Sequence, residues 1–232
     1  MTKRIVVAID GPGGAGKSTV ARRLADKLGF LYIDTGAMYR AVALWARRHG
    51  VDWENAQALE EMAKAAQIEL ESNPVKVTLN GEDVTAAIRE PAISQGASKV
   101  SALGGVRRAL VEKQREMAQT ASVVMEGRDI GTVVFPEAHV KIYLDASVDV
   151  RAERRAEDLR GRGLEADPVA LAPEIAERDR RDSTRADSPL RQAPDAVFFD
   201  TTGLELDEVE AALLKIVRDR TSNGKEIVRT AQ

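Results

Sequence analysis

The stretch that decides the fold is a glycine-rich run at positions 11–19, which reads Gly11-Pro12-Gly13-Gly14-Ala15-Gly16-Lys17-Ser18-Thr19. It matches the pattern G-x-x-x-x-G-K-S/T at every fixed position. Residues 4–9 come directly before it and are mostly apolar and β-branched, as in a buried parallel strand. Directly after it, Val20, Leu24 and Leu28 recur at helical spacing, and Gly29 stands where a helix C-cap belongs. The sequence therefore predicts a strand, a loop and a helix in that order.

A loop with this pattern is suited to bind phosphate. Its glycines allow the backbone to curl so that successive N–H groups point at phosphate oxygens, and the helix that starts near Lys17 adds its positive end. We expect residues 11–19 to hold a chain of phosphate groups, with the Lys17 ammonium at the β- and γ-phosphates and the Ser18 hydroxyl on Mg²⁺. The alternative is a glycine-rich turn that only joins a strand to a helix, and the intact pattern and both flanks argue against it.

Composition restricts the class of protein. The 232 residues allow one α/β domain, and 44% hydrophobic with 31% charged residues describes a globular chain with enough apolar material for a core. The net charge of −3 gives no overall sign of nucleic-acid binding, and the lack of cysteine excludes disulfides and thiolate metal sites. No apolar run approaches the ~20 residues of a membrane span. Because the first strand also starts almost at Met1, we expect a cytoplasmic protein without a leader.

Strands and helices alternate along the rest of the chain. Short apolar runs predict strands at residues 30–33, 122–125, 140–144 and 197–200, and helical periodicity predicts helices at residues 37–49, 55–66, 92–100, 106–117 and 206–220. This alternation predicts an α/β fold in which helices cover both faces of a parallel sheet. A polar tail follows Thr221 and is expected to fray.

One segment has a different pattern of apolar and polar residues from the predicted parallel strands. Residues 68–72 and 74–84 alternate apolar and polar side chains with a period of two, which predicts half-buried antiparallel strands. Asn80-Gly81 is a hairpin turn signal within it. We interpret residues 67–93 as a small β insertion.

Polar residues follow the second predicted strand, at the sheet edge where α/β proteins bind ligands. The candidates to contact a molecule bound opposite the phosphate donor are therefore Asp34, Thr35, Tyr39 and Arg40. Asp34 or Thr35 is equally suited to cap the helix that follows. The local sequence leaves these two interpretations open.

A second group of polar residues, Gly127-Arg128-Asp129, follows the strand predicted at residues 122–125. The arginine fork suits a phosphate, and the aspartate can accept from an amino group such as the exocyclic amine of cytosine. The alternative is a surface ion pair of little energetic value. Glu126, next to this run, is a candidate to reach Mg²⁺ through water, and the sequence does not decide this.

Arginines are concentrated in the third quarter of the chain, at Arg151, Arg154, Arg155, Arg160, Arg162, Arg178, Arg180, Arg181 and Arg185. A basic segment that closes over the donor would stabilise the charge of a transferred phosphoryl group and exclude water, with Gly161 and Gly163 as points of flexibility. The alternative is a solvated charged helix with i,i+4 pairs such as Glu177 with Arg181. For Arg160 and Arg162 both interpretations stay open.

Longer motifs extend beyond the loop, and they are IDGPGGAGKST at residues 9–19, DTGAMYR at 34–40, EGRDIGTVVFP at 126–136, KIYLDAS at 141–147 and ERDRRDSTRADSPL at 177–190. With these motifs the chain resembles the bacterial cytidylate kinases, which phosphorylate CMP and dCMP from ATP. The resemblance covers nearly the whole chain. The runs GRD-x-GTVVFP and RD-x-x-D-x-x-R are much more specific than the phosphate loop.

The resemblance implies a role for each matching residue. Gly11 to Thr19 would hold the ATP phosphates. On the acceptor side, Thr35 and Tyr39 would line the monophosphate pocket, and the cytosine would contact Ser98, Arg128 and Asp129. The acceptor phosphate would contact Arg107 and Arg178, and the ribose and phosphate would contact Asp182 and Arg185. Lys17, Arg128, Arg178 and Arg185 are the expected catalytic residues. Thr35 stands where some relatives carry serine, which keeps the hydroxyl.

The resemblance also implies an architecture and a set of ligands. It implies one kinase domain over residues 1–232, with a core of residues 1–66 and 94–232, an acceptor-binding insertion at 67–93 and a lid region at 151–181. ATP and Mg²⁺ would be the donor and its metal, and CMP or dCMP the acceptor. The even charge distribution favours a monomer, without a nucleic-acid or membrane partner.

Two alternatives differ in acceptor or in class. A kinase for AMP, UMP or shikimate would share the phosphate loop, but the specific runs and the β insertion favour cytidylate. A phosphate-loop switch would hydrolyse nucleotide without an acceptor, and a GTPase would carry an N-K-x-D motif, which the sequence lacks.

Overall fold

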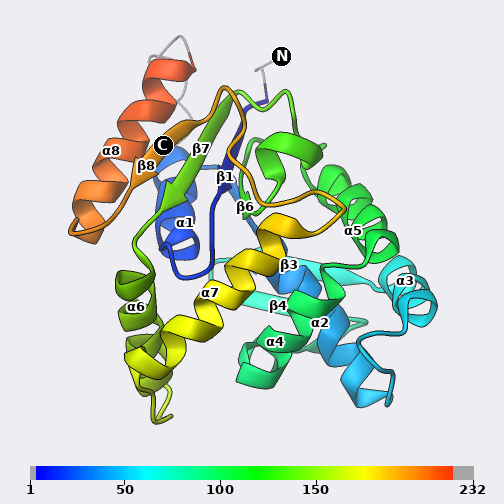
Figure 1. Ribbon diagram of the computed structural model, residues 1–232. Helices are drawn as coiled ribbons and strands as arrows, with labels where there is room; N and C mark the ends of the chain where they lie inside the picture. Colours follow the sequence, from blue (N-terminus) through cyan, green and yellow to red (C-terminus); the bar gives the residue numbers. More distant parts are fainter. Residues whose placement is uncertain (1–3, 222–232) are drawn as a thin grey trace.

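The computed structural model describes residues 4–221 of the chain, and its centre is a five-stranded sheet (Figure 1). The strand order is β2-β6-β1-β7-β8, and every neighbouring pair is parallel. The bounds are Val6–Asp10 for β1, Leu31–Asp34 for β2, Val123–Gly127 for β6, Val140–Asp145 for β7 and Val197–Asp200 for β8. The predicted parallel α/β sheet is confirmed.

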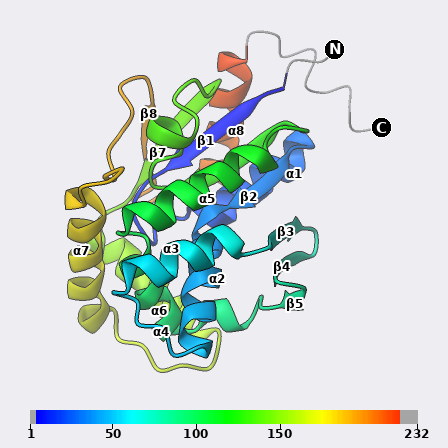
Figure 2. The same cartoon turned by 90° about the vertical axis from the view of Figure 1, so that its right-hand side faces the viewer.

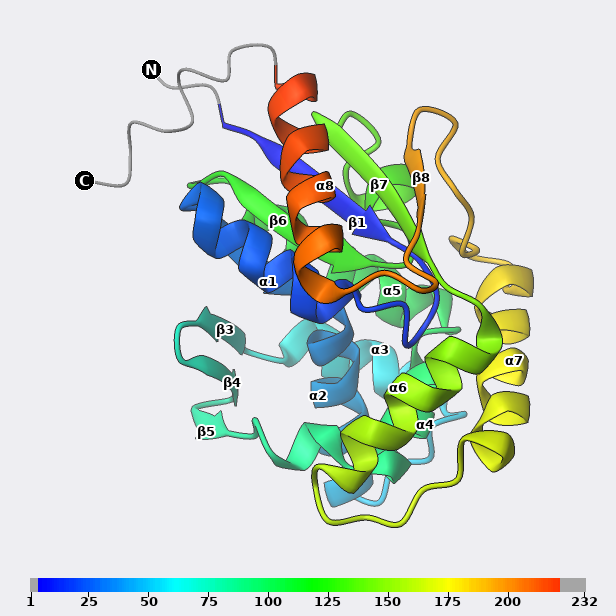
Figure 3. The same ribbon diagram turned by 90° about the vertical axis from the view of Figure 1, so that its left-hand side faces the viewer.

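Helices cover both faces of this sheet. Helices α1 (Lys17–Leu28) and α8 (Leu206–Arg220) lie on one face (Figure 3). Helix α5 (Gly104–Met117) lies on the other (Figure 2). The face under α1 and α8 buries Ile9, Leu24, Ile142 and Leu213 in one hydrophobic cluster. Because strand side chains alternate between the faces, Met125 joins the cluster under α5 instead.

Strand β6 is longer than the sequence pattern predicted. The prediction ended it at residue 125, but its pairing continues to Glu126, opposite Ile9, and to Gly127, opposite Asp10. A central strand has partners on both sides, so its ladder continues through a glutamate that breaks the apolar run. The Glu126 side chain therefore starts from a rigid strand.

A second hydrophobic cluster lies beside the carboxyl ends of the strands. Its elements are α2 (Thr35–Arg48), α3 (Ala56–Ala65), α4 (Pro91–Val100), the turn η1 (Ala87–Arg89) and an antiparallel sheet of β3 (Ile68–Ser72), β4 (Val75–Leu79) and β5 (Glu82–Asp83). Met38, Leu59, Ile88 and Ile93 are fully buried in it. The predicted antiparallel strands are present, with Asn80 and Gly81 at positive φ in the turn.

Helices α6 (Val148–Arg160) and α7 (Pro168–Thr184) form a pair beyond the carboxyl ends of β1 and β7 (Figure 3). Asp182 is the residue of α7 that is buried. Polar contacts rather than an apolar core therefore hold α7 in place. Among the helices of residues 4–221, none has the length and hydropathy needed to cross a membrane. The tail after Thr221, for which we expected fraying, lies outside the described residues.

Candidate active site

The glycine-rich loop forms a curled backbone at the carboxyl end of β1. Gly11, Gly14 and Gly16 have φ values of 147°, 81° and 90°, which side chains other than glycine rarely adopt. A Cβ at Gly11 would overlap the carbonyl oxygen of Leu144 on the neighbouring strand. Gly16 precedes α1 without any side-chain cap. The first-turn N–H groups of α1 are therefore left for an anion.

Lys17 lies across this loop rather than in solvent. Its side chain is buried, and Nζ donates to the Pro12 carbonyl oxygen over 2.6 Å. Burial, followed by the charge of Arg128, lowers the pKa of Lys17 to about 7. Cations held this close together destabilise one another, and a phosphate between them would relieve that cost.

A carboxylate and a hydroxyl meet beside the loop. Glu126 is buried at the end of β6 and accepts from the Tyr32 hydroxyl, and Ser18 lies close to the same carboxylate. Burial, followed by the charge of Asp34, raises the pKa of Glu126. These are hard oxygen donors of the kind Mg²⁺ takes when it keeps several waters and substrate oxygens. Within residues 4–221, no cluster of three or more acidic, histidine or cysteine side chains could hold a metal by itself.

Asp10 is a buried residue beside the loop to which the sequence pattern assigned no role. Its two carboxylate oxygens accept from the backbone N–H groups of Ile130 and Gly131, at 2.8 and 2.7 Å. These residues begin the π-helical turn η2 (Ile130–Val134), directly after Arg128 and Asp129. Asp10 therefore fixes the backbone that presents this pair. Its position between strand and glycine loop is the signal that could have identified it.

The residues predicted at the acceptor come together on the far side of the loop. Arg107 of α5 forms a buried ion pair with Asp129, and its guanidinium lies over the Tyr39 ring, 5.4 Å from the centroid. Arg128 Nε donates to Asp182 over 3.0 Å. An isolated surface ion pair does not describe this arrangement, because three separate elements supply its charges.

Several nitrogens in this cluster have no protein partner. Within residues 4–221, Arg107 Nε, Arg178 Nε and Arg185 Nη2 are buried and find no hydrogen-bond acceptor. Arg185 lies 3.9 Å from Asp182, which Arg128 also contacts. Since buried donors in proteins are almost always satisfied, these nitrogens mark a site for an acceptor-rich ligand.

Arg178 connects the loop with this cluster. Burial, followed by the charge of Arg128, lowers the pKa of Arg178 to about 10. A Cβ placed on Gly13 would lie 3.4 Å from Arg128 Nη2 and 3.9 Å from the Arg178 guanidinium. Both guanidinium groups therefore reach the phosphate loop. The charges of Arg40 and Arg155 also act on Arg178.

Two predicted pocket residues have their hydroxyls engaged within the chain. Thr35 Oγ1 donates to the Glu126 carbonyl oxygen over 2.7 Å, which ties the start of α2 to β6. Ser98 Oγ accepts from Arg181 over 2.9 Å. Asp34 caps α2 by accepting from the Ala37 N–H and also pairs with Arg40. The capping alternative thus holds for Asp34.

The arginine-rich segment divides into two groups. Arg151 is buried and donates to Asp179 over 2.6 Å and to the Gly13 carbonyl over 3.2 Å, so it joins α6, α7 and the loop. Arg160 and Arg162 instead donate on the surface, to the Ala166 carbonyl and to Asp158. The contacts of Arg160 favour the solvated-helix alternative, whereas Arg162 follows α6 and also donates to the Arg89 carbonyl over 3.2 Å, so it reaches the turn η1.

A glycine loop at the end of a central parallel strand, facing arginines from other elements, defines a phosphate-loop kinase. The model of the family "Cytidylate kinase" matches residues 7–219. A cytidylate kinase of Solibacter usitatus is 61% identical over 227 residues, which are 97% of each chain. One of Symbiobacterium thermophilum is 50% identical over 94% of this chain and 97% of its own. The chain belongs to the cytidylate kinase family, and it is an enzyme that phosphorylates CMP and dCMP.

A comparison of folds agrees with this assignment at the level of architecture. An uncharacterized protein from Eubacterium ventriosum superposes with a TM-score of 0.51 at 13% identity. The match covers 92% of this chain and 98% of that one. At this identity it supports the fold alone.

Proposed function

We propose that the enzyme brings ATP and CMP or dCMP together across the cleft between the phosphate loop and Asp129, and transfers the γ-phosphate to give ADP and CDP or dCDP. The observation that carries this is Arg178, whose buried Nε has no partner in residues 4–221 while its guanidinium lies beside both Gly13 and Arg128. Arg178 thus lies between the phosphate loop, here called the donor wall, and the residues around Asp129, here called the acceptor wall. This position is suited to stabilising the γ-phosphate while it is transferred.

On the donor wall, Gly11 to Thr19 would bind the ATP phosphates through backbone N–H groups. The Lys17 ammonium would exchange its contact with the Pro12 carbonyl for phosphate oxygens. Ser18 and Glu126 fit a Mg²⁺ ion, Ser18 directly and Glu126 through water, because both are hard oxygen donors. That ion, when bound, neutralises charge on the triphosphate.

On the acceptor wall, the base and the phosphate would bind different residues. Arg107 engages Oδ2 of Asp129 and leaves its other oxygen for the exocyclic amine of cytosine. Ser98 and Arg128 would complete the base site. Arg107, Arg178 and Arg185 would bind phosphate, with Thr35, Tyr39 and Asp182 lining the rest of the nucleotide.

The reaction needs positioning and charge stabilisation rather than a base. A phosphate oxygen of the acceptor attacks the γ-phosphorus in line with the departing ADP oxygen. The acceptor phosphate is already ionised near neutral pH, so no side chain has to remove a proton. Lys17, Arg128, Arg178 and Arg185 act by holding two anions together.

We also propose that the molecule acts as a cytoplasmic monomer, with residues 67–93 as an acceptor-binding insertion and residues 151–181 as a lid. Helix α7 supports the lid role, because its residues reach both walls while it contributes little apolar packing.

A test compares Arg178→Ala with Arg180→Ala in a coupled assay of ADP release with ATP and a panel of CMP, dCMP, UMP and AMP. Arg180 is on the same helix, is exposed and pairs with Glu177. We expect kcat to fall by about a hundredfold or more for Arg178→Ala, as for the loss of a group that stabilises transition-state charge, and to stay near wild type for Arg180→Ala. Equal activity of the two variants would contradict the role of Arg178, and ADP release that ignores CMP would contradict the proposed reaction.

A further inference from the structure

One contact joins the lid helix to the acceptor wall. Arg181 of α7 donates from Nη1 to Ser98 Oγ of α4 over 2.9 Å, across 83 residues of sequence. Ser98 is only 4% exposed, whereas the Arg181 side chain is 37% exposed. The pair therefore lies at the mouth of the site, with the serine on the inside.

The chemistry of the pair biases how the serine hydroxyl bonds to any further group. A guanidinium can only donate, so the Ser98 oxygen has to accept from it. This contact occupies one of the two lone pairs of the oxygen, and the guanidinium charge beside it disfavours a second N–H donor, whereas the hydroxyl hydrogen stays available for donation. Without Arg181, the Ser98 hydroxyl could rotate and either donate or accept.

We propose that Arg181 is a positioning residue that holds Ser98 as a hydrogen-bond donor toward the acceptor base. This rests on the proposed function, in which Ser98 contacts the base. Cytosine presents an unprotonated ring nitrogen next to its amine, whereas uracil carries N–H at that ring position. A Ser98 hydroxyl held as a donor therefore favours cytosine and opposes uracil.

The arrangement of α7 supports this assignment. Arg178, Arg181 and Asp182 recur at helical spacing of three and four, and so share the face of α7 that lies on the site, and Arg185 follows directly after the helix. Contacts of Asp182 with Arg128 and Arg185 place that face at the acceptor cluster. Arg181 thus makes base recognition depend on α7 lying against α4.

The test is a double-mutant cycle with Arg181→Ala, Ser98→Ala and the double variant, and with Arg180→Ala as the control on the same helix. KM and kcat are measured for CMP and UMP at saturating ATP, and circular dichroism checks that each variant folds. We expect Arg181→Ala to raise KM for CMP about tenfold, the loss typical of a hydrogen bond to a charged group. KM for ATP should change little and KM for UMP should stay the same or fall, so the preference for CMP over UMP should fall.

Two further results separate positioning from simple tethering of the lid. If Arg181 acts through Ser98, the double variant should match Ser98→Ala alone, and Arg181→Lys should restore part of the CMP preference. Effects that multiply in the double variant, equal losses for CMP and UMP, or a silent Ser98→Ala would each overturn the proposal. A wild-type enzyme that does not phosphorylate CMP would instead overturn the proposed function, and the two failures are therefore distinct.

Discussion

Single residues in this site carry charges in places that strongly disfavour them. Lys17 is buried beside Arg128, and its pKa is lowered to about 7 by that burial and then by that neighbour. Asp10 is buried at the end of β1, and burial raises its pKa to about 6. Such costs are typical of functional sites, where the ligand supplies the missing opposite charge.

Lys17 gives the first prediction at this scale. Lys17→Ala should lower kcat by at least about a hundredfold, because the charge lost acts on the phosphates in the transition state. The fold should persist, since the variant removes a buried cation that lies close to other cations and donates to the Pro12 carbonyl. Steady-state kinetics and a thermal melt measure the two effects, and near-normal turnover would contradict the phosphate-loop role.

Asp10 gives a prediction about pH. Its pKa rises from an ordinary 3.8 to about 6 in the folded protein, so the folded state binds more protons than the unfolded state between these values. Stability that involves this group therefore falls as pH rises through that window. Relative to Asp10→Asn, which does not titrate, the wild type should lose about 2 kcal/mol of unfolding free energy between pH 4 and pH 7.

Urea titrations of both proteins at several pH values measure this difference. A constant difference across the window would show that Asp10 keeps an ordinary pKa. Titrations that the Asp10 charge does not influence cancel in this comparison.

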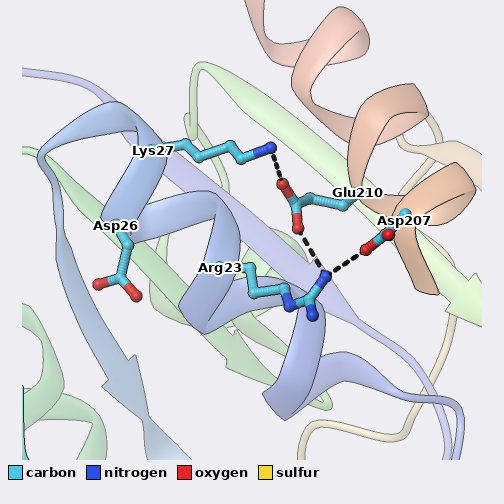
Figure 4. A pocket seen from close by; sticks show the side chains of 5 residues that line it. All are labelled: Arg23, Asp26, Lys27, Asp207 and Glu210. Carbon is cyan, nitrogen blue, oxygen red and sulfur yellow. Dashed lines mark hydrogen bonds and ion pairs between the residues drawn. The ribbon is translucent and has the colours of Figure 1, made fainter.

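Elements are joined by charge as well as by apolar packing. Away from the site, α1 and α8 enclose a hollow of about 560 Å³ lined by Arg23, Asp26, Lys27, Asp207 and Glu210 (Figure 4). Glu210 pairs with Lys27 and also with Arg23, the latter at 3.1 Å, while Arg23 reaches Asp207 at 2.6 Å. This network joins the two helices that cover one face of the sheet.

Glu210→Gln tests this connection. The hydrogen bond from Lys27, and then that from Arg23, lowers the pKa of Glu210 below its ordinary 4.5. A lowered carboxyl pKa means stability that is present above 4.5 and lost as pH falls below it. We expect the variant to lose about 1–2 kcal/mol at neutral pH, to match the wild type in strong acid, and to keep wild-type kinetics. A change in kcat would contradict a purely structural role, and urea titration gives the stability.

At the scale of the whole molecule, the site exists because distant segments converge. Lys17 comes from α1, Arg107 from α5, Arg128 from the end of β6, and Arg178 from α7. Parallel strands bring their carboxyl ends to one edge, and α7 closes over that edge (Figure 1). Positive groups from four elements thus surround the space for two nucleotides.

The molecular surface leads to a prediction of oligomeric state. In residues 4–221, the exposed large hydrophobic side chains are Leu164, Val169, Phe198 and Leu204, which come from two separate regions of the chain. Such scattered residues are normal on monomers. Sedimentation equilibrium should give a single species of 25.2 kDa with and without nucleotides, and a stable dimer would contradict this expectation.

The amino-acid sequence by itself determined the phosphate loop, the parallel α/β sheet and the antiparallel strands, because glycine patterns and apolar periodicity are local properties. It also indicated, through its motifs, the family and the candidate residues from Gly11 to Arg185. Only the tertiary structure decided that Asp10 holds the backbone after Asp129, that Asp129 pairs with Arg107, and that Arg181 binds Ser98. These contacts span 22 to 120 residues of sequence, and their partners are chosen by how the chain packs, which no local pattern records.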